Sequence, residues 1–129
     1  MESINKYYNL TGEILDSCIS VHKELGPGLL ESIYEVCLVK EFIFREIQCK
    51  NQVLIPVTYK GESINKEFRI DILVENEIVL EIKSAETLLP VHEAQIISYL
   101  RLTGKKLGFL VNFNVSLLKN GFKRFVNNF

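Results

Sequence analysis

The chain has 129 residues, of which 47% are hydrophobic and 24% are charged, and its formal net charge is −1. This length predicts a single domain over residues 1–129, and the composition excludes a disordered or fibrous protein. No apolar run approaches the roughly 20 residues of a membrane helix, and residues 1–6 lack the layout of a secretory signal. We therefore expect a cytoplasmic protein.

The charge is unevenly distributed along the chain. No acidic residue occurs from Ala94 to Phe129, whereas lysine and arginine recur there. A basic C-terminal third could contact the phosphates of nucleic acid, or these side chains could simply solvate a helix and its loops. The candidates for nucleic-acid contact in this segment are Arg101, Lys105, Lys106, Lys123 and Arg124.

The three cysteines are too dispersed for a structural zinc site. Cys18, Cys37 and Cys49 are odd in number and form no CxxC pair. Because reduced cysteines behave as small hydrophobes, we interpret all three as structural.

Helical periodicity dominates the N-terminal part. Apolar residues at helical spacing predict an amphipathic helix over 11–25, with Thr11 as its N-cap. Gly26-Pro27-Gly28 must interrupt it, because glycine adds flexibility and proline lacks a hydrogen-bond donor. A second helix is expected over about 29–46.

The period changes to two in the middle of the chain. Strands are predicted over 51–59, 64–75 and 77–84. Pro56 indicates that the first is an edge strand or carries a bulge. The almost wholly apolar run from Ile78 to Lys83 is typical of a central strand that is covered on both faces.

The C-terminal part predicts a helix over about 91–103, a strand over 106–113 and a short helix after Gly121. The strand–helix–strand step between 77–84 and 106–113 predicts a right-handed parallel crossover. The expected architecture is mixed α/β, with about four strands in a mixed sheet and helices on both faces.

Three charged residues break the most apolar strands. Asp71 interrupts 68–74, while Glu81 and Lys83 interrupt the central strand and, being two apart, share one of its faces. Burial of unpaired charge is costly, so these residues require ion pairing among themselves, a metal or a function. Antiparallel pairing would bring Asp71 beside Glu81. Two carboxylates suit Mg²⁺, which acidifies bound water, and Lys83 could position the hydroxide or stabilise the charge on phosphorus.

The spacing Asp71-x(9)-Glu81-Ile-Lys83 resembles the PD-(D/E)XK nuclease superfamily, although Ile70 replaces the proline of its name. The segment Gln95-Ile96-Ile97-Ser98-Tyr99 is similar to the Q-x-x-x-Y motif of the branch that contains the RecB-type exonuclease domains. A narrower resemblance is to the GxxExxY family of small bacterial proteins, through Gly28-Leu29-Leu30-Glu31-Ser32-Ile33-Tyr34. Segments 21–27 and 107–113 are similar to this family too, and the resemblance covers about residues 8–128.

The resemblance implies a restriction-endonuclease-like αβββαβ core and a nuclease that depends on Mg²⁺ or Mn²⁺. Asp71 and Glu81 would bind the metal with Glu31, which is the helix-borne carboxylate. Lys83 would be catalytic, and Gln95 and Tyr99 would line the site as further catalytic residues. Separately, Arg69 shares the strand face of Asp71 and could bind phosphate or neutralise the carboxylates.

Simpler explanations exist for several of these residues. Glu31 could be an exposed residue favoured by the helix dipole, and Gln95 and Tyr99 could cap buried backbone groups. Tyr34 is expected in the core. His22 is expected in the core or at its boundary, although some relatives use an upstream histidine as a metal ligand.

These observations favour a metal-dependent nuclease that acts on DNA rather than RNA. The alternative is a catalytically silent module of the same fold that binds nucleic acid or a protein, because 129 residues leave little room for a separate recognition element. A homodimer would enlarge the area of DNA contact. A purely structural scaffold would leave Asp71, Glu81 and Lys83 unexplained.

Overall fold

The computed structural model describes the backbone of residues 2–127 and the side chains of residues 7–127. Three helices, five strands and one short 3₁₀ helix follow each other within these residues. They are α1 (Glu2–Leu25), α2 (Glu31–Phe44), β1 (Cys49–Tyr59), β2 (Glu62–Val74), β3 (Ile78–Lys83), α3 (Pro90–Thr103), β4 (Leu107–Asn112), η1 (Leu118–Gly121) and β5 (Phe122–Val126).

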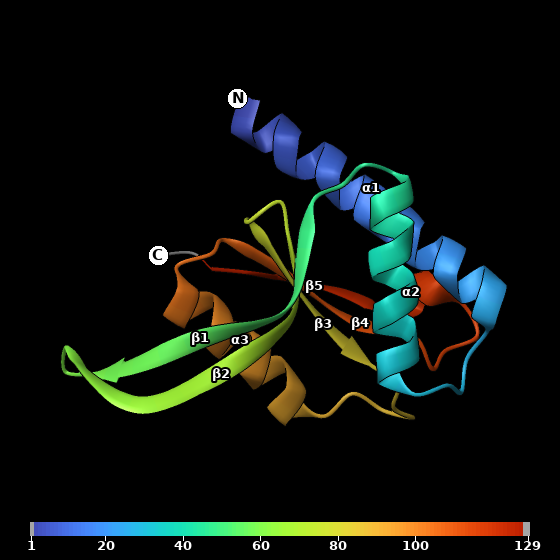
Figure 1. Cartoon of the computed structure of the whole chain (residues 1–129). Coiled ribbons are helices and arrows are strands. Elements are labelled where there is room, and N and C mark those ends of the chain that lie inside the picture. Colours follow the sequence, from blue (N-terminus) through green and yellow to red (C-terminus); the bar gives the residue numbers. More distant parts are fainter. Residues whose placement is uncertain (1, 128–129) are drawn as a thin grey trace.

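The strands form one mixed sheet in the order β1-β2-β3-β4-β5. Among the described strands, β3 and β4 are the parallel pair, and α3 connects them. The helices α1 and α2 cover one face of the sheet and α3 covers the other (Figure 1). The predicted mixed α/β fold, with its central strand at 78–83, is therefore confirmed.

The sheet separates two layers of core. On the side of α1 and α2, the strands contribute buried residues such as Leu80 and Phe109. On the side of α3, Leu73 and Val79 pack with Ile96 from the helix. Because both faces of β3 are covered, its sequence is apolar at nearly every position.

The two ends of the chain differ from the sequence-based expectation. Helix α1 begins at Glu2, so Thr11 lies inside the helix and the prediction of Thr11 as the N-cap was wrong. The segment after Gly121 is strand β5, which pairs antiparallel with the edge of β4, and not a short helix. Its Phe122 ring stacks on Phe109, with 4.5 Å between centroids. Backbone pairing with β4 and this aromatic contact stabilise the fifth strand.

The loop between α1 and α2 is fixed by Tyr34. Gly26 and Gly28 have φ angles of +72° and +94°, which disfavour residues with a Cβ. The Tyr34 hydroxyl donates to the Gly26 carbonyl at 2.5 Å and accepts from the Leu29 N–H at 3.1 Å. Its buried ring stacks on Phe113 at a centroid distance of 4.4 Å. Tyr34 is thus a core residue, as expected, and sets where α2 begins.

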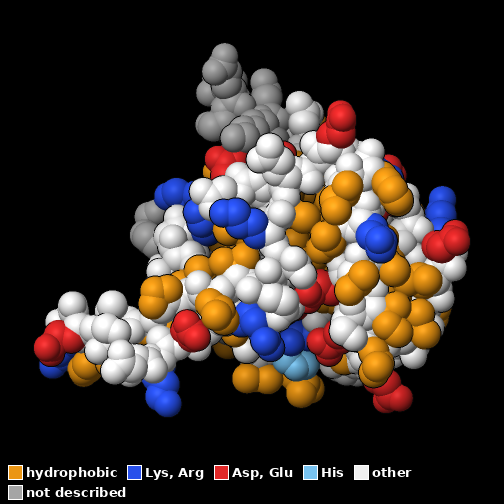
Figure 2. All heavy atoms as spheres, in the orientation of Figure 1, with side chains coloured by type: hydrophobic (Ala, Val, Ile, Leu, Met, Phe, Trp, Pro, Cys, Tyr) orange, Lys and Arg blue, Asp and Glu red, His pale blue; other side chains and the backbone are white. Residues whose placement is uncertain are grey.

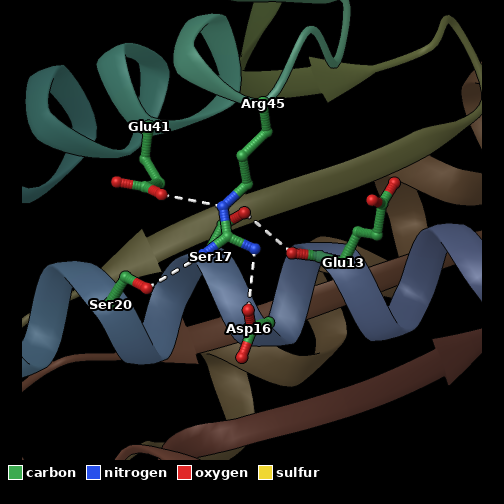
Figure 3. A network of polar contacts seen from close by, with 6 residues as sticks. All are labelled: Glu13, Asp16, Ser17, Ser20, Glu41 and Arg45. Atoms are coloured by element: carbon green, nitrogen blue, oxygen red, sulfur yellow. Dashed lines mark hydrogen bonds and ion pairs between the residues drawn. The ribbon is translucent and has the colours of Figure 1, made fainter.

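Arg45, directly after α2, ties the two N-terminal helices together (Figure 3). Its guanidinium donates to Glu41 at 2.7 Å, to Asp16 at 2.8 Å and to Ser20 at 2.9 Å. The hydrogen bond to Glu41 is the main cause of a raised Arg45 pKa, followed by the one to Asp16. This clamp fixes α2 on α1 and so fixes the carboxylates that α2 presents to the sheet.

The β1–β2 hairpin extends beyond the body of the molecule as an arm (Figures 1 and 2). Its outer strand, β1, is an edge strand whose register shifts between Val57 and Thr58. The expectation that Pro56 marks an edge strand or an irregularity is therefore confirmed. The base of this arm borders the cavity described below.

None of the described helices is both long and apolar enough to cross a membrane. The three cysteines are free thiols, and Cys18 is buried in the core as part of α1.

Candidate active site

Asp71 on β2 and Glu81 on β3 join the two strands with their side chains. The Glu81 carboxylate accepts a hydrogen bond from the Asp71 N–H at 2.9 Å through Oε2, and Oδ2 of Asp71 accepts one from the Ile82 N–H at 2.8 Å. These bonds continue the β2–β3 ladder beyond its last backbone pair, Ile72 with Leu80. Within the described residues, Oδ1 of Asp71 and Oε1 of Glu81 accept no hydrogen bond, so each carboxylate keeps one available oxygen.

A cavity of about 480 Å³ opens over this pair. Three parts of the chain surround it: the start of α2, the base of the hairpin with β3, and one face of α3. The lining residues are Glu31, Leu54, Glu67, Phe68, Arg69, Asp71, Glu81, Lys83, Gln95 and Tyr99. The structure thus brings together on one cavity the predicted residues Glu31, Arg69, Asp71, Glu81, Lys83, Gln95 and Tyr99. Acidic and basic side chains meet between α2 and the base of the hairpin (Figure 2).

The cavity has more negative than positive groups. Its four carboxylates face only two cations, Arg69 and Lys83. Burial raises the pKa of Asp71, although the hydrogen bond from Ile82 opposes this shift. Burial also raises the pKa of Glu81, to about 8, and the charge of Asp71 adds to the increase. An additional cation between the two carboxylates would relieve both effects.

Lys83 has a fixed backbone and an available ammonium group. Its carbonyl accepts from the Phe113 N–H at 3.0 Å. Next to it, the Asn112 side chain donates to the Ala85 carbonyl at 2.9 Å and accepts from the Ala85 N–H at 3.1 Å. The Ser84 hydroxyl donates to the Leu29 carbonyl at 2.6 Å, which joins this loop to the segment before α2. Within the part of the chain that the structure describes, Nζ of Lys83 makes no hydrogen bond or ion pair.

Gln95 and Tyr99 lie one turn apart on α3, so they share a helix face. The Tyr99 ring stacks on Phe68, with 4.4 Å between centroids. Burial raises the Tyr99 pKa, and the charges of Glu81 and Asp71 raise it further, so the phenol remains a hydrogen-bond donor. Neither the Gln95 nor the Tyr99 side chain caps a described backbone group, which leaves both available to a ligand.

Sequence reasoning missed Glu35, one turn after Glu31 on α2. Glu35 is buried, whereas Glu31 is exposed. Both oxygens of Glu35 accept hydrogen bonds from Nε2 of Gln52, at 2.7 and 2.8 Å. A charge inside the apolar helical run 33–38 was the signal that could have revealed this residue.

The predicted basic residues Arg101, Lys105, Lys106, Lys123 and Arg124 do not line this cavity. Lys123 is 3.8 Å from Glu93 on α3, whereas Arg124 and Lys106 border a different cavity beside α1. His22 also lies away from the site, with Nε2 at 2.7 Å from the Val115 carbonyl. It is a buried residue with a hydrogen-bond partner, as expected for the core.

The donor set fits a hydrated divalent cation. No three His, Cys, Asp or Glu side chains among the described residues form a cluster that could hold a metal alone, so Glu31 does not complete one with Asp71 and Glu81. Mg²⁺, however, commonly binds through one or two carboxylates and keeps several waters. Asp71 and Glu81 lie on adjacent strands, line one cavity and each keep an available oxygen, which matches that requirement.

Comparison with known proteins identifies the family. Residues 8–125, well over half of the chain, match the family described as the PD-(D/E)XK nuclease superfamily. The chain belongs to this superfamily. Its sheet and helices form the restriction-endonuclease-like core, with β5 added at the edge.

A solved structure titled "Crystal structure of SSO0001" has a similar fold, with a TM-score of 0.52 and 22% sequence identity. The likeness covers 75% of this chain and 49% of that one, so this chain spans about half the length of the solved structure. At this identity the match shows the fold alone. No curated protein matches the chain.

Proposed function

We propose that this member of the PD-(D/E)XK superfamily is a divalent-metal-dependent nuclease of the GxxExxY branch. It would hydrolyse phosphodiester bonds of nucleic acid, with DNA preferred to RNA. The observation that carries the proposal is the hydrogen-bonded Asp71–Glu81 pair, which lines the same cavity as Lys83.

The charges of the cavity support a metal-dependent reaction. Four carboxylates against two cations would repel a phosphodiester from the metal-free site. A Mg²⁺ or Mn²⁺ ion on Asp71 and Glu81 would supply charge neutralisation for the phosphate and a water of lowered pKa. The protein residues then need only bind and orient the substrate.

The other cavity residues that the sequence predicted have roles that match their chemistry. Lys83 is a point charge whose Nζ makes no hydrogen bond or ion pair with the described residues, so it can hold the attacking water or the negative charge that develops on phosphorus. Arg69 can bind a phosphate oxygen with its planar guanidinium. Gln95 and Tyr99 can donate hydrogen bonds to the bound strand, and Glu31 can orient water from α2.

The test is cleavage of defined substrates by the purified full chain. Single- and double-stranded DNA and RNA of one sequence are incubated with Mg²⁺, Mn²⁺ or EDTA, beside Asp71→Asn and Lys83→Met. We expect metal-dependent cleavage, fastest on DNA, that both substitutions abolish. Equal cleavage by wild type and variants would reveal a contaminating enzyme. No cleavage of any substrate with either metal would refute the nuclease proposal.

One observation favours the second candidate, a silent module that binds a protein. Exposed apolar side chains gather over α2 (Figure 2), as at an interaction surface. They include Leu30, Ile33, Val36, Ile43 and Phe44. A second copy of this chain is one partner of that kind. Analytical ultracentrifugation of wild type and Val36→Glu would detect a dimer through this face, and calorimetry with Mn²⁺ would separate the module from the enzyme, which must bind metal.

A further inference from the structure

Glu35 is a buried carboxylate whose described hydrogen-bond partners are all neutral. The residue is 9% exposed, and among the described residues no lysine, arginine or histidine forms an ion pair with it. Its partners are the neutral amides of Gln52, at 2.7 and 2.8 Å, and Asn51, at 3.4 Å. Neutral amides offset only part of the cost of burying a charge, so stability alone does not account for a carboxylate at this position.

The residue that binds Glu35 has an unusual backbone. Gln52 lies inside β1 with a φ of +54°, a left-handed conformation that is unfavourable for a residue with a Cβ. The β1–β2 register pairs Asn51 with Ile72 and Val53 with Ile70, so the irregularity at Gln52 lies directly across from Asp71. Local strain of this kind persists where surrounding contacts impose it, and it is concentrated at functional sites.

Glu35 is connected to the carboxylate pair through hydrogen bonds and the pairing of β1 with β2. Gln52, which binds Glu35, lies across from Asp71, and the Asp71 N–H donates to the Glu81 carboxylate at 2.9 Å. Acidic residues from α2, β2 and β3 are therefore linked within one region, and Arg69 and Lys83 line the cavity beside the Asp71–Glu81 pair. An ion from outside the chain would add positive charge to that of these two residues and reduce the repulsion between the carboxylates further.

We propose that Glu35 is a positioning residue that raises the affinity of the Asp71–Glu81 pair for a divalent cation. Gln52 holds the Glu35 carboxylate in place, and the same contact sets the bend of β1 opposite Asp71. Glu35 need not touch the ion, since a buried charge acts over several ångströms where the dielectric is low. This inference rests on the proposed metal-dependent function.

The test is calorimetric titration of Mn²⁺ into the full-length chain. Glu35→Gln removes the charge but keeps an oxygen that can accept from Gln52. We expect it to weaken Mn²⁺ binding by about tenfold or more, as loss of groups that orient metal ligands commonly does. The matched control is Glu67→Gln, which removes one charge from the exposed wall of the same cavity and should change affinity less than about threefold. Equal effects of the two substitutions, or none from Glu35→Gln, would overturn the inference.

A second variant separates positioning from simple stability. Gln52→Gly accepts the left-handed backbone without strain and removes the amide that holds Glu35. We expect a folded protein, by circular dichroism, with Mn²⁺ affinity reduced in the same direction as in Glu35→Gln. A lower melting temperature with unchanged Mn²⁺ affinity in either variant would show that the contact is only structural. If wild type itself binds no Mn²⁺, the proposed nuclease function fails first, which distinguishes the two failures.

Discussion

The Asp71 N–H donates to the Glu81 carboxylate across the β2–β3 boundary, at 2.9 Å. The carboxylate of Asp71 in turn accepts from the residue that follows Glu81, at 2.8 Å. Each acidic residue therefore completes the hydrogen bonding of the strand opposite, in addition to presenting an oxygen to the cavity. Substitutions at these positions change both the sheet and the site, which determines how the predictions below are designed.

Lys83→Met should abolish catalysis and leave the fold and metal binding intact. The Lys83 ammonium has no described partner, so its loss should change the free energy of unfolding by less than about 1 kcal/mol. Removal of a group that stabilises developing charge should lower kcat by about 100-fold or more. Initial rates of DNA cleavage test the loss of catalysis, and Mn²⁺ calorimetry tests whether metal binding is kept. Lys66→Met on the exposed hairpin is the control for both measurements. A Lys83→Met protein that cuts at the wild-type rate would exclude a catalytic lysine.

Glu81→Gln should stabilise the metal-free protein at alkaline pH. The folded-state pKa of Glu81 is raised to about 8 from an ordinary 4.5, so folding favours the protonated form. Its contribution to stability is thus greatest below pH 4.5 and is lost as the pH rises towards 8. Glutamine keeps an oxygen for the Asp71 N–H but cannot ionise. In EDTA at pH 8 the variant should be more stable by about 1–3 kcal/mol, and this difference should vanish near pH 4.

Urea denaturation across pH 4–9 measures this difference directly. Addition of millimolar Mn²⁺ at pH 8 should make wild type more stable than Glu81→Gln, because only wild type gains binding energy from the ion. A wild-type stability that does not fall between pH 5 and 8 in EDTA would contradict a raised Glu81 pKa.

The sequence predicted the site better than it predicted the chain ends, for physical reasons. Charges inside apolar strands are costly, so Asp71 and Glu81 stand out without any structure. The alternation of apolar and polar residues reflects which side chains are buried, and this local pattern identified the strand at 51–59. Strand β5 was not predicted because its aromatic residues, Phe122 and Phe125, are three positions apart and do not alternate as in a strand. Its stability comes from pairing with β4. Pattern alone cannot supply such a partner.

Glu35 and the basic residues show a second limit of sequence. Glu35 is recognised only once Gln52 is seen across the fold. Lysines and arginines that are clustered in sequence separate in space, because neighbours along β5 alternate between the two faces of the sheet. Lys123 accordingly faces α3 while Arg124 faces α1.

Tyr34→Phe should destabilise the loop before α2 and leave the packing of the core unchanged. The phenylalanine ring can keep the stack on Phe113, but the bonds to Gly26 and Leu29 are lost. We expect a cost of about 1–2 kcal/mol in the free energy of unfolding. Hydrogen exchange should accelerate in residues 26–31. The control is Tyr59→Phe on the exposed hairpin, which should be neutral, and equal exchange in both variants would contradict the proposed anchor.

Two glycine substitutions should have opposite effects on the free energy of unfolding. A Cβ on Gly121 would lie 2.2 Å from the Asn112 carbonyl oxygen, so Gly121→Ala must displace β4 or η1 and should cost about 2 kcal/mol or more. A Cβ on Gly12 meets nothing within 4 Å inside α1, so Gly12→Ala should stabilise by about 0.5–1 kcal/mol. Melting temperatures of the two variants check both signs. A neutral Gly121→Ala would show that Asn112 can move, in which case the Ala85 contacts next to Lys83 should loosen as well.

The carboxylates that join β2 to β3 affect what evolution can discard. A descendant that no longer needed catalysis would still require acceptors for the backbone N–H groups of Asp71 and Ile82. Acidic residues at both positions should therefore be retained after the activity is lost. The Lys83 side chain makes no comparable hydrogen bond with the described residues. In an inactive lineage, we therefore expect substitutions at position 83 before substitutions at positions 71 and 81.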